Sequence, residues 1–299
     1  ACKNSVQAVE PAAFALEDKG YFIRRVGTDG YKIGFQPTLK KVVNDRRASI
    51  DYESQVMPLL KETIQNEFKK NSQLPISFFP LDSTSIQDNP KLTIVVADPD
   101  KEWINSEDFK YEVSQWIKTR GTSPRLYPAA LIWCFKKQGR ELRDKAEVLL
   151  AWKQVNKEYT DGLLGSEMSS NDISELRSKL VDSENAVKDE IWASYRYIAL
   201  YTKKQDNHNL HVIDLGQGHS SACISLSERI ITALKSQALL NDSVGISYLE
   251  RYWPKAFIEK GTWPLKSLRQ SFLDGSLTRL VDPDAVLKSK IHDFVYKGD

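Results

Sequence analysis

Residues 91–97 (KLTIVVA) decide the fold, because they form a continuous apolar run with a proline close by on each side. Such a run, bounded by turn residues, is typical of a strand that is buried on both faces. A second run of this kind, 129–135 (AALIWCF), follows another proline. Between the two, residues 106–120 place their apolar side chains on one helical face. This strand–helix–strand order predicts neighbouring parallel strands in an α/β sheet.

Further strands and helices extend the pattern in both directions. The other expected strands are 76–79, 194–202 and 209–215. The last two can pair as an antiparallel hairpin at the edge of the sheet. The other expected helices cover about 52–70, 138–158, 171–191 and 221–240. The predicted fold class is therefore α/β, with a mostly parallel sheet flanked by helices.

Both ends of the chain predict smaller, winged-helix-like elements. Residues 5–19 are expected to form a helix, and 20–36 a β-hairpin around a glycine-containing turn. The last part of the chain contains short helices separated by Trp-Pro pairs. We therefore expect three domains. They are a helix-plus-wing tail at 1–49, an α/β core at 50–225 and a small helical, winged-helix-like domain at 226–299.

Bulk composition restricts the class of protein without naming a function. The 299 residues are 41% hydrophobic and 27% charged, with a formal net charge of +2, which is close to the globular average. The three cysteines are far apart and form no CxxC pair, so neither a disulfide framework nor a zinc site is predicted. No apolar stretch is long enough to span a bilayer, and a cytoplasmic location without a membrane partner is expected. Because the chain begins Ala-Cys-Lys without a methionine, we expect it to be a fragment of a longer protein.

A glycine-containing turn is the first candidate site. The sequence has no GxxxxGK[ST] loop, so the backbone nest that holds triphosphates is not predicted. Gly216, Gly218 and Ser220 lie after an expected strand and before an expected helix, where backbone N–H groups can bind an anion. The competing interpretation is an ordinary tight turn between a strand and a helix.

A pair of carboxylates is the second candidate. Asp98 and Asp100 follow the 91–97 strand, and ligands of open α/β sheets gather at such carboxyl ends. The two side chains are a candidate Mg²⁺ site of a metal-dependent nuclease. The competing interpretation is that Asp-Pro simply makes a turn. No catalytic residue is otherwise predicted.

Two basic clusters are the third candidate. The first contains seven cations: Arg24, Arg25, Lys32, Lys40, Lys41, Arg46 and Arg47. The second contains five: Arg251, Lys255, Lys260, Lys266 and Arg269. Basic residues on a wing and the helix after it suit phosphate contacts, which give salt-dependent affinity that does not depend on sequence. The alternatives are a solvated face or a protein interface.

Five segments, in this order, resemble a known family. They are YKIGFQPTLKKVVNDRRASI (31–50), KLTIVVADPD (91–100), RGTSPRLYPAALIWCF (120–135), EVLLAWKQV (147–155) and GSLTRLVDPDAVLKSKIHDFVYKG (275–298). Together they resemble the C-terminal half of the large ATPases called the domain of unknown function 499 family, whose relatives include the PglY-type ATPase of phage-exclusion systems. In that family an AAA-type P-loop domain precedes this region. The resemblance therefore implies ATP and Mg²⁺ in the parent protein and no cofactor in this chain.

The resemblance also implies a setting and a set of partners. We expect a non-catalytic regulatory region that engages DNA or a partner within a larger ATPase used in antiviral defence. Expected partners are the ATPase domain, duplex DNA, and a DNA methyltransferase or other defence proteins. One alternative is the metal-dependent nuclease that uses Asp98 and Asp100. Another is a protein-interaction scaffold, for which Trp253 and Trp263 are the candidate anchors.

Overall fold

The structure is a computed structural model that describes residues 11–12, 15–16, 23–26, 30–33, 38–164, 170–203 and 208–297. The chain divides into two compact units, each described here by itself. Unit 1 comprises Ala1–Leu59 and Glu141–Val187, and unit 2 comprises Leu60–Arg140 and Lys188–Asp299. Most of the predicted helix at 5–19 lies outside the described residues. The division into 1–49, 50–225 and 226–299 stays a prediction.

Unit 2 is built on a five-stranded sheet with the order β3-β4-β7-β8-β9. The strands are β3 (Ile76–Phe78), β4 (Thr93–Val96), β7 (Leu131–Lys136), β8 (Tyr195–Tyr201) and β9 (Leu210–Asp214). The first three run parallel, and β7–β8 and β8–β9 are antiparallel. The predicted α/β class and the edge hairpin are therefore confirmed, in a mixed sheet whose strands run mostly in one direction, with β8 reversed.

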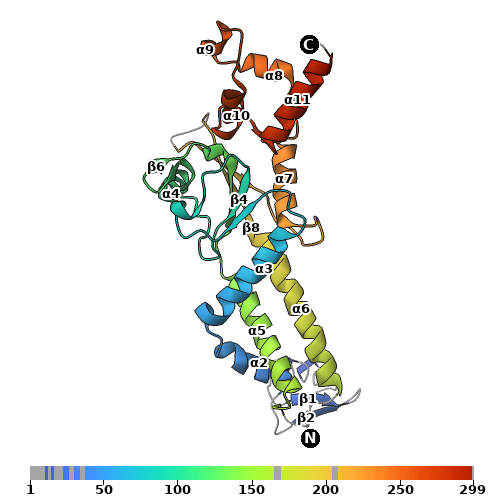
Figure 1. Cartoon of the computed structure of the whole chain (residues 1–299). Coiled ribbons are helices and arrows are strands. Elements are labelled where there is room, and N and C mark those ends of the chain that lie inside the picture. The colour runs from blue at the N-terminus through green and yellow to red at the C-terminus, as the bar shows by residue number, and fades with distance from the viewer. Residues whose placement is uncertain are drawn as a thin grey trace. The chain divides into compact units, whose positions relative to one another are not determined.

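One face of the sheet packs against α4 (Glu107–Lys118), as Figure 1 shows. Ser106 begins this helix by accepting a hydrogen bond from the Phe109 N–H, which satisfies one of the free donors of the first turn. Phe109 then packs in a cluster with Trp133 and Phe135 of β7. The rings of Trp133 and Phe135 stack with centroids 5.5 Å apart. Because Trp133 and Phe135 are two positions apart on β7, both side chains point to this face of the sheet.

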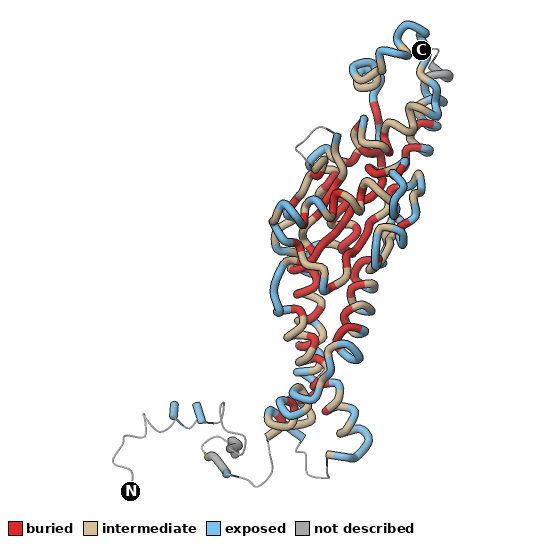
Figure 2. The backbone as a smooth tube through the Cα atoms, turned by 90° about the vertical axis from the view of Figure 1, so that its left-hand side faces the viewer, coloured by how far each residue is buried: buried red, intermediate tan, exposed pale blue. Residues whose placement is uncertain are grey.

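Helices α3 (Met57–Lys69) and α7 (Leu226–Ser236) lie on the other side of the sheet (Figure 1). Phe68 of α3 is fully buried and packs edge-on against Tyr195 of β8, with centroids 5.7 Å apart. The Ser227 hydroxyl of α7 donates to the Phe68 carbonyl at 2.8 Å. With helices on both sides, β7 is buried along its whole length and β4 at all residues but Thr93; the buried residues are the red segments of the tube in Figure 2.

Unit 1 contains the predicted hairpin and a helical core. Strand β1 (Ile23–Val26) pairs antiparallel with β2 (Gly30–Ile33), which confirms the hairpin expected at 20–36. The helices are α2 (Leu39–Ala48), a π-helical segment at Tyr52–Val56, α5 (Glu141–Thr160) and α6 (Ser170–Ser194), the last of which continues into unit 2. The core of the helices contains Leu39, Val43, Ala151, Trp152, Val155 and Leu176.

The C-terminal segment of unit 2 is small and helical. Its elements are β10 (Leu240–Asn241), α8 (Ile246–Arg251), α9 (Lys255–Ile258), α10 (Leu265–Leu273), β11 (Arg279–Leu280) and α11 (Pro283–Lys297). The two short strands pair in parallel. The Asp282 carboxylate accepts a hydrogen bond from the Ala285 N–H at 3.0 Å, which caps the last helix. Among the described residues, no helix has the length and apolar character needed to cross a bilayer.

The remaining elements are short connections in unit 2. They are β5 (Thr119–Arg120), β6 (Ser123–Pro124) and the 3-10 turns Ser83–Ser85 and Pro128–Ala130.

Candidate functional site

Two of the four arginines in the first basic cluster, Arg46 and Arg47, are bound to carboxylates of α5. Arg46 Nε donates to both oxygens of Glu158, at 2.7 and 3.0 Å. This hydrogen bond raises the pKa of Arg46 and is also the main cause that lowers the pKa of Glu158. Arg47 Nη2 lies 3.2 Å from Glu147 and 3.4 Å from Asp144. The charge of both guanidinium groups is therefore largely balanced inside unit 1.

The other members of this cluster lie on α2 and the hairpin. Lys41 forms an ion pair with Asp45 one helical turn later, at 2.5 Å, and Lys40 is exposed on the same helix. Arg24 of β1 lies opposite Lys32 of β2 in the hairpin register. Arg25 is the next residue on β1. The side chains of these three hairpin residues lie outside what the structure describes, so their phosphate contacts stay a prediction.

The glycine turn is occupied by the protein's own groups. The Gly216 N–H donates to Asp214 at 2.8 Å, and the Gly216 carbonyl accepts from Arg229 Nη2 at 2.8 Å. A Cβ atom at Gly218 would lie 2.2 Å from Arg229 Nη1, so a residue without a side chain is required there. Ser220 donates to Asp189 at 2.5 Å. These contacts favour the tight-turn interpretation of the three predicted anion-binding residues.

This turn also does not open directly into a helix. The helix expected at 221–240 begins instead at Leu226, after Ser225, whose side chain accepts a hydrogen bond from the Glu228 N–H. Gly216 and Gly218 thus lie well before the N-terminus of α7, where they cannot share its dipole.

The Asp98 turn has the local geometry expected of an Asp-Pro sequence. The Asp98 carboxylate accepts from the Asp100 N–H at 3.1 Å, and Lys61 of α3 lies 2.8 Å from its other oxygen. In the described part of the chain, no group of three or more histidine, cysteine, aspartate or glutamate side chains is placed to hold a metal ion. Lys61 is the partner that sequence spacing did not reveal.

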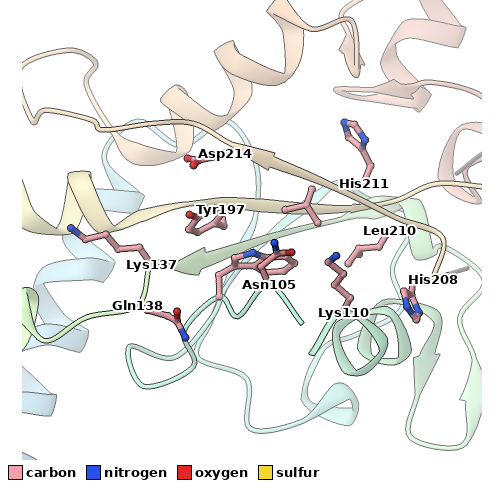
Figure 3. Close-up of a pocket in the computed structure, with 11 residues that line it drawn as sticks. Asn105, Lys110, Lys137, Gln138, Tyr197, His208, Leu210, His211 and Asp214 are labelled. Carbon is pink, nitrogen blue, oxygen red and sulfur yellow. The ribbon is translucent and has the colours of Figure 1, made fainter. Parts of the chain in front are cut away.

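A polar cavity of about 640 Å³ lies over the β8–β9 edge of the sheet, beside the start of α4. In Figure 3, Lys137 and Gln138 lie toward one end and Lys110 and His208 toward the other, with Asn105 between them. The cavity follows the carboxyl ends of β4 and β7, which is the usual place for a ligand in such a sheet.

The charges around this cavity compensate one another. Lys110 pairs with Glu107 at 3.0 Å, and Lys137 pairs with Glu190 at 3.1 Å. Hydrogen bonds from Lys110, and then from His208, lower the pKa of Glu107. Because each lysine already has a carboxylate, the cavity has no excess positive charge with which to hold an anion.

The second basic cluster lies in the C-terminal segment, and Glu259 is the one acidic residue within 251–270. Arg251, Lys255 and Lys260 are exposed and, among the described residues, have no carboxylate within ion-pair distance. Lys255 is the first residue of the short helix α9, and Arg251 and Lys260 lie before and after this helix in the chain. The neighbouring tryptophans, Trp253 and Trp263, pack against each other with centroids 5.6 Å apart. The scaffold anchors predicted from the sequence are therefore half-buried and packed within this segment.

Two buried arginines, Arg125 and Arg279, and the half-buried Arg229 were not predicted. Each donates to backbone carbonyls: Arg125 to Ile86 and Ser83, Arg229 to Trp192 and Leu215, and Arg279 to Ala129 and Tyr201. Burial lowers the pKa of all three, and that of Arg279 to about 10. All remain charged at neutral pH and tie distant segments of unit 2 together.

Comparisons with known proteins give no relative: no protein-family model, no curated protein and no solved structure matches the chain.

Proposed function

We propose that this chain is a non-catalytic, duplex-DNA-engaging region of a larger AAA-type ATPase that acts in phage defence in the cytoplasm. The single observation that carries the proposal is that Arg251, Lys255 and Lys260 form no ion pair within the described residues. ATP and Mg²⁺ would be held by the ATPase domain of the parent protein. A DNA methyltransferase or another defence protein would be a further partner.

We assign these cations to DNA because, within the described residues, no carboxylate neutralises them. A lysine or arginine without a carboxylate partner can neutralise a phosphate and release a condensed counterion at no cost in broken ion pairs. The C-terminal segment also presents its short helices α8, α9 and α10 in succession, which is compatible with a winged-helix-like element. We assign the main DNA contact to this segment.

The metal-dependent nuclease alternative has weaker support. Asp98 would have to release Lys61 and its own turn before it could bind a metal ion. A plasmid-nicking assay with Mg²⁺ or Mn²⁺ tests it, because nicking that is lost in Asp98→Ala would restore the nuclease as the function.

The test of DNA binding is a salt titration with the full chain and a short fluorescent duplex. Each phosphate contact contributes about −0.9 to the slope of log K against log salt. We expect the double variant Lys255→Glu/Lys260→Glu to weaken binding at least about tenfold and to make the slope shallower by about 2.

The matched control is Lys91→Glu/Lys157→Glu, which makes the same change in net charge at two exposed lysines elsewhere. We expect it to have a much smaller effect. An equal loss of DNA affinity in the two double variants would show that only net charge matters, and the proposed DNA contact would be wrong. No binding of the parent chain at low salt would remove DNA as the partner altogether.

A further inference from the structure

A groove of about 530 Å³ lies between α10 and α11. The two helices are labelled side by side in Figure 1. The groove is lined by Leu265, Lys266, Arg269, Asp284, Leu287, Lys288, Ile291 and His292. We call it the α10–α11 groove. Lys266 and Arg269 belong to the second basic cluster, but neither is among the three cations on which the DNA proposal rests.

The floor of the groove is apolar and partly open to solvent. Leu265 is 51% exposed and Ile291 is 41% exposed, while Leu287 beneath them is 5% exposed. Along α11 the lining residues recur at 284, 287, 288, 291 and 292, which is the spacing of a single face of a helix. That face extends for about 12 Å at 1.5 Å per residue. A slot of this kind between two helices has the shape that a third helix fills.

The rim of the groove is positively charged. Lys266 and Lys288 are exposed, and within the described residues neither has a carboxylate within ion-pair distance. The one acidic residue of the lining, Asp284, is held by Arg269, whose Nη2 lies 2.7 Å from Asp284 Oδ2. Among the described lining residues, an occupant therefore meets two lysines without an ion pair, and the one carboxylate is already held by Arg269.

We propose that the α10–α11 groove binds an acidic amphipathic helix of a partner protein. Apolar residues at positions i, i+3, i+4 and i+7 of that helix would cover Leu265 and Ile291, as in other helix-in-groove complexes. Glutamates or aspartates beside them would pair with Lys266 and Lys288. DNA would satisfy the lysines but would leave the apolar floor exposed, because the phosphate backbone offers no apolar surface to cover it.

The test uses the full chain and a designed fluorescent peptide of about 16 residues, or about four helical turns. It has leucines along one face and glutamates beside them. Two control peptides match it: one has the same composition in an order without an apolar face, and the other replaces each glutamate with lysine. We expect saturable binding of the designed peptide and at least about tenfold weaker binding of both controls, which corresponds to about 1.4 kcal/mol.

Variants of the chain locate the peptide. Ile291→Ser and Lys266→Glu/Lys288→Glu change exposed side chains of the groove, so a preserved melting temperature verifies folding, and each is expected to weaken peptide binding at least about tenfold. Lys255→Glu/Lys260→Glu is the matched control and should leave peptide binding unchanged while it weakens DNA binding. The two proposals thus fail separately.

Three results would overturn the groove proposal. One is equal binding of the designed peptide and the reordered peptide. Another is insensitivity of peptide binding to both groove variants. The third is a case in which the designed peptide does not bind, and Lys266→Glu/Lys288→Glu loses affinity for DNA or for vesicles of phosphatidylglycerol and phosphatidylcholine. That result would assign the groove to a polyanion or a lipid surface instead.

Discussion

The two basic regions of this molecule are similar in sequence and different in structure. Around Arg46 and Arg47, the guanidinium groups face carboxylates of α5, at distances of 2.7 to 3.4 Å. Around Lys255 and Lys260, the described residues provide no such carboxylate. The charges of the first region hold two helices of unit 1 together. The charges of Lys255 and Lys260 are not neutralised by described residues and can bind an anionic partner. A count of basic residues cannot separate these two roles, because the neutralising groups come from distant parts of the chain.

The largest effect is expected for a buried cation of the C-terminal segment that lies outside the second basic cluster. Arg279 is 7% exposed, and its Nε donates to the Ala129 carbonyl at 2.8 Å. Arg279→Met would leave buried carbonyls without donors, each costing about 1–3 kcal/mol. We expect the free energy of unfolding to fall by about 2–4 kcal/mol in urea denaturation. Arg251→Met, the exposed control in the same segment, should change it by less than about 0.5 kcal/mol.

A smaller effect is expected when one available cation is removed. Arg251→Ala should weaken duplex-DNA binding about three- to tenfold and make the salt slope shallower by about 0.9. The reason is the loss of one phosphate contact. Fluorescence anisotropy across a salt series measures both quantities. An unchanged slope would mean that Arg251 does not contact a phosphate. The proposed DNA contact of the second region would then consist of Lys255 and Lys260 alone.

The first region should respond in the opposite way. Arg46→Ala removes a two-oxygen contact to Glu158 from a side chain that is 36% exposed. We expect unfolding to become easier by about 0.5–1 kcal/mol, with DNA affinity and its salt slope unchanged. Chemical denaturation and the same anisotropy series provide the two readouts. A clear loss of DNA affinity without a loss of stability would reverse the comparison.

The smallest effect is a pH dependence of the same pair. The pKa of Glu158 is lowered from its ordinary value of 4.5, chiefly by the hydrogen bond from Arg46. A carboxylate with a lowered folded pKa stabilises the fold above the unfolded pKa and loses that contribution as the pH falls through the folded value. Glu158→Gln should therefore be less stable than the parent at pH 7, by under about 1 kcal/mol. Denaturation curves at a series of pH values should show the difference shrinking below pH 4.5; a constant difference would mean that packing, not charge, causes it.

Much of the sheet could be predicted because its strands are apolar on both faces. Residues 91–97 and 129–135 each contain a fully buried stretch of strand. Such strands are continuous apolar runs in the sequence, so they could be recognised without an alternation of apolar and polar residues. The helix begun by Ser106 was predictable for a local reason, since its cap is three residues from the group it satisfies.

The charged contacts could not be predicted in the same way. Arg46 and Glu158 are 112 residues apart, and Lys61 reaches Asp98 from a different helix. From the local sequence, Gly218 was predicted to be part of an anion-binding loop. The guanidinium group of Arg229 fills the space beside it, and this arginine comes from the following helix, so the local sequence does not reveal the contact. Contacts of this kind depend on the completed fold and leave no periodic signal in the sequence.

The connection between β7 and β8 has a consequence for the order of folding. The two strands pair directly, yet about 60 residues of chain separate them, including most of the helical part of unit 1. Bringing the ends of such a long excursion together costs loop-closure entropy before any strand contact forms. If α5 and α6 associate first, they shorten the effective loop and bring Lys136 and Tyr195 within reach. We therefore expect the central pairing of the sheet to form late, and truncations within Glu141–Val187 to slow the folding of unit 2 even though they remove none of its residues.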